Sequence, residues 1–377
     1  MLNELQTSSV VLDPMSGSGT VLRQASEIGL RALGFDLDPL AVLMSRTWNT
    51  AVADEIIEAV TSDLLNEARG LDGRTIVLPW IDADAETAAF IDFWFGQKQR
   101  AELRRVACVL HSFDKRNFGQ NKQAAADVLR IALSRIIVTK ERGASLARDT
   151  SHSRPHKVVQ KSDYEVFKGL ERSLKQVRQK LSEHPPWGGV RVGLGDARKL
   201  TDIRTGSIDA VLTSPPYLNA IDYLRGHRLS LVWLGHTLGS LRAIRSTSIG
   251  SERAPEHDFS AELCAPIERA MVDGDVSPRH SAMIKRYCHD LVLMMSEMAR
   301  VTRVGGLVTL VVGNSCLKGH FIRNSDGVCA AATLAGMKLL KMEERDLPVR
   351  SRYLPTPASG ALSQRMRTET VISFGRI

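Results

Sequence analysis

The sequence predicts an α/β protein with an open, mostly parallel sheet, helices on both faces of the sheet, and a helical inserted domain. Three observations carry this prediction. Residues 10–29 read as a short apolar strand, a Gly-rich turn and a helix. Residues 210–213 and 307–312 are short apolar runs, typical of strands buried on both faces of a parallel sheet. Residues 74–188 instead carry apolar side chains at helical intervals.

The N-terminal motif is typical of a nucleoside-binding site. The first N–H groups of a helix lack intrahelical partners, so the helix within residues 10–29 can direct them at a ligand. The second strand, 32–35, ends in Asp36, where folds of this kind grip a ribose diol. Leu22 stands three residues after Gly19, where a dinucleotide-binding motif needs a glycine. The motif therefore predicts a ligand that contains an adenosine but no pyrophosphate.

A long helical pattern follows and separates the second strand from the third. Residues 40–70 have apolar side chains at three- and four-residue spacing, and the segment Gly70-Leu71-Asp72-Gly73 ends the pattern. We expect residues 1–73 and 189–377 to form one domain and residues 74–188 to form the inserted domain. The helices predicted in the insertion are Ala85–Phe95, Gln97–Leu110, Lys122–Ile137 and Tyr164–Leu181.

Two polar segments are candidates for contact with nucleic acid. Residues 140–157 are rich in hydroxyl, imidazole and basic side chains and have almost no apolar anchor, so they suit either phosphate contacts or a solvated connector. Arg154 and Lys157 are the phosphate candidates there. A second segment, 241–277, is polar and unperiodic and supplies Arg242 and Arg245. The net charge of +8 fits a polyanionic partner.

A double proline ends the strand at residues 210–213 and forms a stiff loop, because proline cannot donate to a sheet ladder. The loop presents Ser214, Pro215, Pro216 and Tyr217 in the crevice beyond the carboxyl ends of the strands. The Ser214 hydroxyl and the Pro215 carbonyl can accept the two N–H protons of an amino group on a nucleobase. Tyr217 offers a ring on which the base can stack.

An isolated Pro-Pro-Tyr is more often a surface turn or a polyproline ligand. The preceding strand and the N-terminal motif favour the base-binding interpretation, which requires both motifs to lie at one edge of the sheet. Asp222 and Tyr223 follow closely and either line the base pocket or cap the next helix. The remaining elements expected are helices over 229–234, 287–299 and 327–334, and strands over 307–312, 338–345 and 369–374.

The segments DPMSGSGT, GFDLDP and TSPPY together resemble the S-adenosylmethionine-dependent amino-methyltransferases of DNA. The resemblance covers residues 10–45 and about 190–375. It implies a Rossmann-like methyltransferase fold with a seven-stranded sheet. The TSPPY form resembles the N4-cytosine branch, since N6-adenine enzymes usually carry Asp or Asn where Ser214 stands.

The resemblance also implies roles for individual residues. Residues of the N-terminal motif would bind the cofactor, S-adenosylmethionine, with Asp36 on its ribose and Asp196, at the tip of the third strand, on its adenine. The target base would be held by Ser214–Tyr217. The other implied cofactor residues are Asp13, Pro14, Gly17, Gly19 and Thr20.

The implied substrate is double-stranded DNA, whose target base must rotate out of the helix before it can react. N6-adenine methylation, methylation of an RNA base, and a catalytically silent DNA-binding protein stay open as alternatives. A cognate restriction endonuclease is a further expected partner. The five cysteines form no C-x-x-C pair and none follows a proline, so we expect neither zinc nor carbon-5 cytosine chemistry. Without a long apolar run, we expect no membrane partner and a cytoplasmic location at the bacterial nucleoid.

Overall fold

The computed structural model divides the chain into two compact units, which are described separately. Unit 1 comprises residues 1–37, 189–221 and 246–377, and unit 2 comprises residues 38–188 and 222–245. No helix in the described part of the chain is long and apolar enough to cross a lipid bilayer. The described residues are 2–116, 118–148, 155–218, 222–250, 261–274, 276–317, 320–346 and 368–377.

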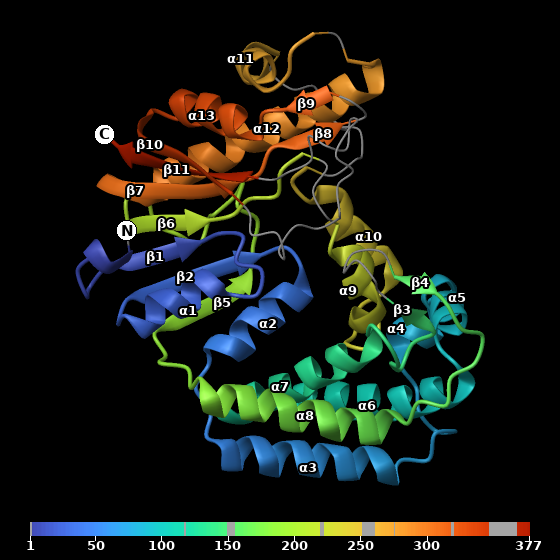
Figure 1. Cartoon of the computed structure of the whole chain (residues 1–377). Coiled ribbons are helices and arrows are strands. Elements are labelled where there is room, and N and C mark those ends of the chain that lie inside the picture. The colour runs from blue at the N-terminus through green and yellow to red at the C-terminus, as the bar shows by residue number, and fades with distance from the viewer. Residues whose placement is uncertain are drawn as a thin grey trace. The chain divides into compact units, whose positions relative to one another are not determined.

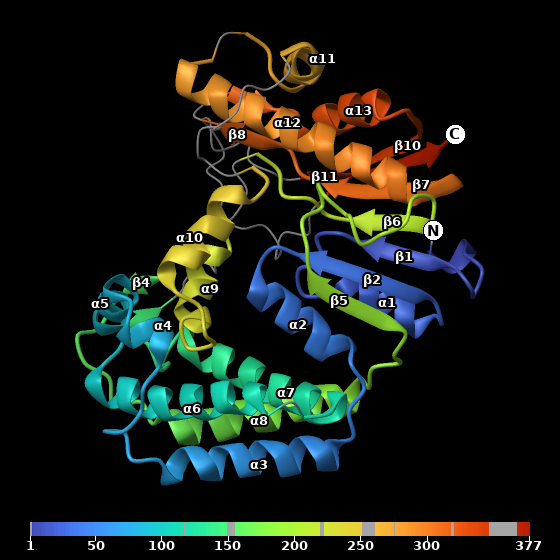
Figure 2. The ribbon, with the colours of Figure 1, turned by 180° about the vertical axis from the view of Figure 1, so that it is seen from behind.

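Unit 1 contains a seven-stranded sheet formed by the described residues (Figures 1 and 2). The five strands β5, β2, β1, β6 and β7 are parallel, whereas β11 is antiparallel to both β7 and β10. This confirms the predicted mostly parallel sheet of the Rossmann-like methyltransferase fold. In spatial order the strands are β10 (Met337–Asp346), β11 (Thr368–Arg376), β7 (Thr302–Val312), β6 (Ile208–Thr213), β1 (Val10–Asp13), β2 (Arg31–Asp36) and β5 (Val190–Leu194).

Helices cover both faces of this sheet. Neighbouring side chains of a strand point to opposite faces, so adjacent residues of β1 pack against different helices. Val11 of β1 packs in a cluster with Leu22 of helix α1. The next residue, Leu12, packs in a different cluster, which includes Met298 of α12. The other elements of unit 1 are a 3-10 turn (Leu2–Glu4), α1 (Thr20–Glu27), α11 (Ala261–Met271), α12 (Pro278–Val301), β8 (Ser315–Leu317), β9 (His320–Ile322) and α13 (Asn324–Leu334).

Strand β7 begins at Thr302, five residues before the start predicted from the apolar run. Gly305 has a φ of 72°, and the pairing of β7 with β6 shifts register in this region. A Cβ atom at Gly306 would lie 2.9 Å from the carbonyl oxygens of both Arg303 and Asp209. Glycine therefore lets the strand continue through this irregularity.

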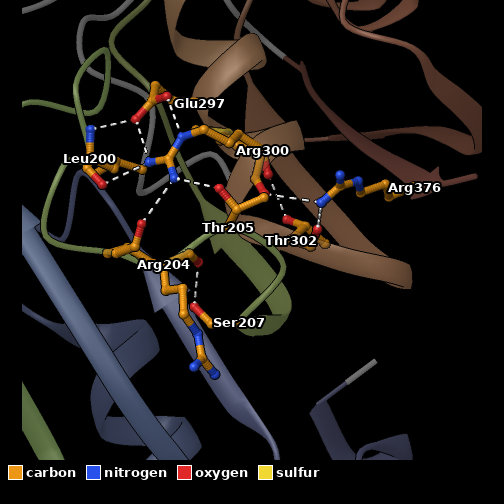
Figure 3. Close-up of polar contacts among 10 residues, drawn as sticks. Leu200, Arg204, Thr205, Ser207, Glu297, Arg300, Thr302 and Arg376 are labelled. Atoms are coloured by element: carbon orange, nitrogen blue, oxygen red, sulfur yellow. Dashed lines mark hydrogen bonds and ion pairs between the residues drawn. The ribbon is translucent and has the colours of Figure 1, made fainter.

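The loop between β5 and β6 is fixed to the end of α12 by Arg300 (Figure 3). Its guanidinium pairs with Glu297 at 2.7 Å and donates to the carbonyl oxygens of Leu200 and Ile203 at 2.8 and 3.0 Å. Glu297 in turn accepts the backbone N–H of Leu200 at 2.7 Å. The guanidinium of Arg376 donates to the carbonyl oxygen of Arg300 at 3.0 Å. This ties the last strand to the same corner.

Unit 2 is mainly helical, as predicted, and has its own apolar core. Asp38 caps α2 by accepting the N–H of Leu40 at 2.9 Å. The pattern predicted as one helix over 40–70 is interrupted, because Thr50 and Ala53 are extended. The elements are α2 (Pro39–Asn49), α3 (Asp54–Gly70), α4 (Pro79–Asp82), α5 (Ala85–Trp94), α6 (Gln97–Lys115), α7 (Gln120–Ile137), β3 (Ala147–Arg148), β4 (His156–Lys157), α8 (Val166–Glu183) and α9 (Leu224–Leu231); α10 (Leu238–Thr247) crosses into unit 1.

The units differ from the predicted ranges 1–73, 74–188 and 189–377 in two stretches. Residues 38–73 and 222–245 belong to the helical unit. The reason is burial: α2 and α3 contact α7, and α9 contacts both α2 and α7. Their apolar side chains are part of the same core as those of the inserted helices. The helical unit therefore includes helices that precede the predicted insertion and a helix that follows it in the sequence.

Two expectations about polar segments are wrong. Residues 140–157 do have apolar anchors, since Ala144, Leu146 and Ala147 are buried. The segment 241–277 is not unperiodic, because helices α10 and α11 occupy much of it. In α10, Leu238 and Leu241 are buried three residues apart, which is the spacing of one helix face.

Replacing Gly306 by alanine should destabilise the protein by about 1–3 kcal/mol, since the added methyl group meets backbone oxygens that cannot move aside easily. Thermal unfolding followed by circular dichroism checks this. Gly70→Ala is the matched control, because a Cβ atom there meets nothing within 4 Å and the residue is helical. It should leave the melting temperature unchanged or raise it slightly. Equal melting temperatures for the two variants would contradict the prediction.

Candidate active site

The Gly-rich turn and the double-proline loop lie at the same edge of the unit 1 sheet. Strands β1 and β6 are parallel neighbours, with Leu12 opposite Val211. Beyond this pair, the Thr213 hydroxyl donates to Asp13 Oδ1 at 2.6 Å in a buried position. The two motifs follow directly from these residues, so the predicted juxtaposition is confirmed. Residues 200 positions apart in the chain thereby form one site.

The turn after β1 is built from left-handed glycines. Gly17 and Gly19 have φ values of 50° and 85°, and Gly19 is the N-cap of α1 without a side-chain cap. The N–H of Gly17 donates to Asp36 Oδ2 at 2.9 Å. Space above Gly17 is open, since a Cβ atom there would have no neighbour within 4 Å. Pro14 and Thr20 lie on either side of these glycines, Pro14 directly after β1 and Thr20 at the start of α1.

Ser16 adds a polar group that the sequence analysis did not single out. Its backbone N–H donates to the carbonyl oxygen of Phe35 at 2.8 Å, which holds the turn against β2. Its side-chain oxygen is buried and has no hydrogen-bond partner among the described residues. A buried hydroxyl without a partner is costly in a folded protein, so it marks a place where a polar ligand would be stabilising.

Asp13 is a buried carboxyl group next to a second one. Burial raises the pKa of Asp13 to about 7, although hydrogen bonds from Thr213 and from the N–H of Met15 oppose this shift. The negative charge of Asp36 raises the pKa further. A site with two neighbouring carboxyl groups favours a cationic or hydroxyl-rich ligand, because either would stabilise their ionised forms.

Asp196 follows β5 as predicted, and its carboxylate is already engaged in the structure. Arg198 donates to its Oδ2 at 2.6 Å and also reaches Asp290 Oδ1 on α12 at 2.6 Å. Asp290 is buried, which makes this a chain of charges from the sheet edge into the core. Neither Arg198 nor Asp290 was predicted, because the sequence gives no sign that α12 lies beside β5's loop.

The double-proline loop has a fixed hydroxyl at its start. The Ser214 side chain is exposed, and its hydroxyl donates to the carbonyl oxygen of Val311, in β7, at 3.0 Å. A hydroxyl group has one proton and two lone pairs. Because β7 takes the proton, the Ser214 oxygen can present its lone pairs only as an acceptor.

Tyr287 of α12 contacts the same loop through its hydroxyl group. Its ring is completely buried and its hydroxyl donates to the carbonyl oxygen of Pro216 at 3.2 Å. Burial raises the pKa of Tyr287 far above its usual range, so the hydroxyl remains protonated. Gly250 closes the other side, because its φ is 73° and a Cβ atom there would lie 3.1 Å from the carbonyl oxygen of Tyr217. The loop therefore receives a hydrogen bond at Pro216 and packs closely against Gly250 at Tyr217.

Asn324, the first residue of α13, holds the end of the loop. Its Oδ1 accepts the N–H of Leu218 at 3.3 Å, and its Nδ2 donates to the carbonyl oxygen of Gly313 and to Ser315 Oγ, both at 3.0 Å. The side chain is fully buried. Nothing in the sequence singled out Asn324, since a polar residue before an apolar helix is ordinarily a cap.

Three of the four residues predicted to contact DNA lie among the described residues of unit 2, each in different surroundings. The Lys157 ammonium lies 4.5 Å from the ring centre of Phe93. Arg242 forms an ion pair with Glu86, and Arg245 forms one with Asp222 at 2.5 Å. Asp222 also accepts the N–H of Arg225 at 3.3 Å, which supports its capping role. Arg154 lies outside the described residues.

Comparison with known proteins gives one weak relative by sequence. No family model matches the chain. The type II methyltransferase M.BsoBI of Geobacillus stearothermophilus is 22% identical over 365 residues, covering 84% of this chain and 71% of its own. Two of the similar solved structures are an S-adenosylmethionine-dependent methyltransferase from Methanosarcina mazei and a putative DNA modification methylase from Thermus thermophilus in complex with S-adenosylmethionine.

The first structure has a TM-score of 0.34, 9% identity, and coverage of 100% of this chain and 95% of its own. The second has a TM-score of 0.25, 16% identity, and coverage of 48% and 53%. These scores are too low to add to the fold assignment, which rests on the strand order of unit 1.

Asp13 should make the protein less stable as the pH rises from about 4 to about 7. In this range the unfolded chain releases the Asp13 proton, near the ordinary aspartate pKa of 3.8, while the folded chain keeps it. Urea unfolding of the wild type and of Asp13→Asn isolates the effect, since the amide mimics the protonated acid. The wild type should lose stability relative to the variant, by at most about 1.4 kcal/mol per pH unit. A difference that is constant with pH would contradict the assignment.

Proposed function

We propose that this protein is an S-adenosylmethionine-dependent DNA methyltransferase that methylates the N4 amino group of cytosine. The observation that carries the proposal is the Ser214 hydroxyl, which β7 fixes as an acceptor at 3.0 Å. The Ser214 hydroxyl lies at the sheet edge where the Asp13–Thr213 hydrogen bond joins the Gly-rich turn to the double-proline loop. A site for an amino group thus adjoins a site for a nucleoside.

The residues of the Gly-rich turn fit S-adenosylmethionine as cofactor. This molecule has a carboxylate, two positive centres and a ribose diol. The start of α1, which has no side-chain cap, and the buried Ser16 hydroxyl suit the carboxylate. Asp13 suits the positive centres, and Asp36 suits the diol, as the resemblance implies. Asp196 would reach the adenine while its pairing with Arg198 holds its carboxylate in place.

The TSPPY loop would bind and orient the target cytosine. Ser214 Oγ and the Pro215 carbonyl oxygen accept hydrogen bonds from the two N–H groups of the amino nitrogen. These bonds favour a pyramidal nitrogen whose lone pair points at the methyl carbon instead of being delocalised into the ring. Tyr217 stacks on the base, a contact of about 1–3 kcal/mol. Pro216 is held by the Tyr287 hydroxyl and Leu218 by Asn324, so the loop needs little reorganisation when the base enters.

The bound cofactor supplies the methyl group, and the protein's contribution is orientation. Held by the Gly-rich turn, the sulfonium would supply the methyl group to the amino nitrogen and leave as a neutral thioether, and the nitrogen would lose one proton to solvent. Orientation of two reactants can account for much of such a rate increase. The cytosine must first leave the duplex, at a cost of a few kcal/mol.

The proposed substrate is double-stranded DNA, and basic residues of unit 2 would contact its backbone. The net charge of +8 and the name of the relative M.BsoBI support a DNA substrate. Lys157, Arg154, Arg242 and Arg245 remain candidates for phosphate contact. The proposed setting is the bacterial cytoplasm, with a restriction endonuclease of the same target sequence as the expected partner.

Purified protein incubated with S-adenosylmethionine and genomic DNA lacking the modification should produce N4-methylcytosine, because Ser214 is typical of the cytosine branch. Nucleoside mass spectrometry after DNA digestion checks this. N6-methyladenine as the sole product would overturn the base assignment while retaining the DNA methyltransferase. A product formed only on structured RNA, in competition with duplex DNA, would overturn the substrate assignment. Cofactor binding without any product would indicate a silent DNA-binding protein.

A Ser214→Ala variant should turn over roughly 100-fold more slowly, because one oriented hydrogen-bond partner of the reacting group is lost. Its affinity for S-adenosylmethionine, measured by titration calorimetry, should be unchanged. Ser207→Ala is the matched control: Ser207 lies just before the other end of β6, and its hydroxyl also donates to a backbone oxygen, that of Arg204, at 2.6 Å (Figure 3). Similar rates for both variants would show that Ser214 has no part in the reaction.

A further inference from the structure

We propose that Arg225, Arg228 and Arg245 form a phosphate-binding site on unit 2 that holds the backbone of the DNA substrate. Arg228 is the central residue of this site. These three residues are called the arginine cluster below. The inference rests on the proposed function, because it takes DNA to be the substrate. Arg225 and Arg228 lie on α9, and Arg245 lies on α10.

Arg228 is a half-buried cation without a carboxylate partner among the described residues. Its guanidinium lies 5.2 Å from the ring centre of Phe90, and its buried Nε atom has no hydrogen-bond partner. Moving a charged group out of water is costly unless the charge is paired. The contact with an aromatic face offsets only a small part of that cost. The site is therefore poised for an anion.

The neighbours of Arg228 increase this excess of positive charge. Both Arg225 and Arg245 pair with a single carboxylate, that of Asp222, at 3.7 and 2.5 Å. Two guanidinium groups thus share one acid and the third has none, so three positive charges and one negative charge leave a local charge of about +2. Burial lowers the pKa of Arg228, and the positive charges of Arg245 and Arg225 lower it further, with Asp222 opposing them. The protein maintains this cluster against both desolvation and repulsion.

Several arginines of unit 2 each pair with an acid that no arginine of the cluster shares. Arg69 pairs with Glu171, Arg116 with Glu67, and Arg178 with Asp54. Arg242 also lies on α10, but its ion pair with Glu86 separates it from the cluster. Arg228 differs from these arginines in having no carboxylate partner among the described residues.

A phosphate group is the anion that best fits this arrangement. Guanidinium groups bind phosphate oxygens through paired N–H donors, and several of them can share one phosphodiester. Arg225 and Arg245 retain 36% and 46% exposure of their side chains, so they can reach a ligand outside the fold. A DNA strand supplies such phosphates in series, and contacts of this kind position it without reading its sequence.

The test measures how DNA affinity depends on salt in the full-length protein. Fluorescence anisotropy with a 30-base-pair duplex, at a series of salt concentrations, gives the slope of log affinity against log salt. For Arg228→Gln the magnitude of that slope should fall by about 0.9, the value for one lost phosphate contact. Arg116→Gln is the matched control: it removes the same charge, but from an arginine that Glu67 already neutralises. Its slope should equal that of the wild type.

The outcomes separate this inference from the proposed function. An unchanged slope for Arg228→Gln, in a protein whose wild type binds DNA and methylates it, would overturn the inference alone. A wild type that binds no DNA would overturn both. Should Arg228→Gln melt at a lower temperature, the double variant Arg225→Gln/Arg245→Gln replaces it, since both side chains are more exposed, and its slope should fall by up to about 1.8. Equal inhibition of wild type and variant by inorganic phosphate would count against a phosphate site in the cluster.

Discussion

The hydrogen bond between Thr213 and Asp13 is the contact on which the candidate active site depends. It is buried, measures 2.6 Å, and links the end of β6 to the end of β1. The Gly-rich turn follows Asp13 directly, and the double-proline loop follows Thr213 directly. Proline prevents the second chain from continuing the sheet, and left-handed glycines bend the first chain sharply. Both loops must therefore leave the sheet at this edge.

A single helix, α12, supports the loops around this contact. Tyr287 in its first half holds Pro216 of the double-proline loop. Asp290, one turn later, binds Arg198 and through it the residue at the tip of β5. Arg300 near its end fixes the remainder of the β5–β6 loop. Because the helix is continuous, these supports are rigidly connected, and the geometry that the proposed methyl transfer needs is preformed.

Unit 2 is larger than the insertion predicted from the sequence. Its apolar core includes α2 and α3, which precede the predicted insertion, and α9, which follows the double-proline loop. Sequence periodicity identified most of its helices, but it gave α10 no helical character, because Leu238 and Leu241 stand among serines, glycines and arginines. The same misjudged segment contains Arg245. Its pairing with Asp222, and the excess charge that this leaves around Arg228, are visible only when the helices are packed.

The sequence by itself determined the strands of the seven-stranded sheet and the two motifs, because short-range patterns encode them: apolar runs define buried strands, and glycine and proline define the turns between them. It also put forward Asp13, Asp36, Ser214 and Tyr217 as candidate site residues, since each lies beside such a turn. Only the tertiary structure decided which side chains support them. Tyr287 and Asn324 act from helices 71 and 106 residues away from the residues they hold, and no local pattern specifies a hydrogen bond across that distance. Their roles arise from packing, which depends on the whole chain at once.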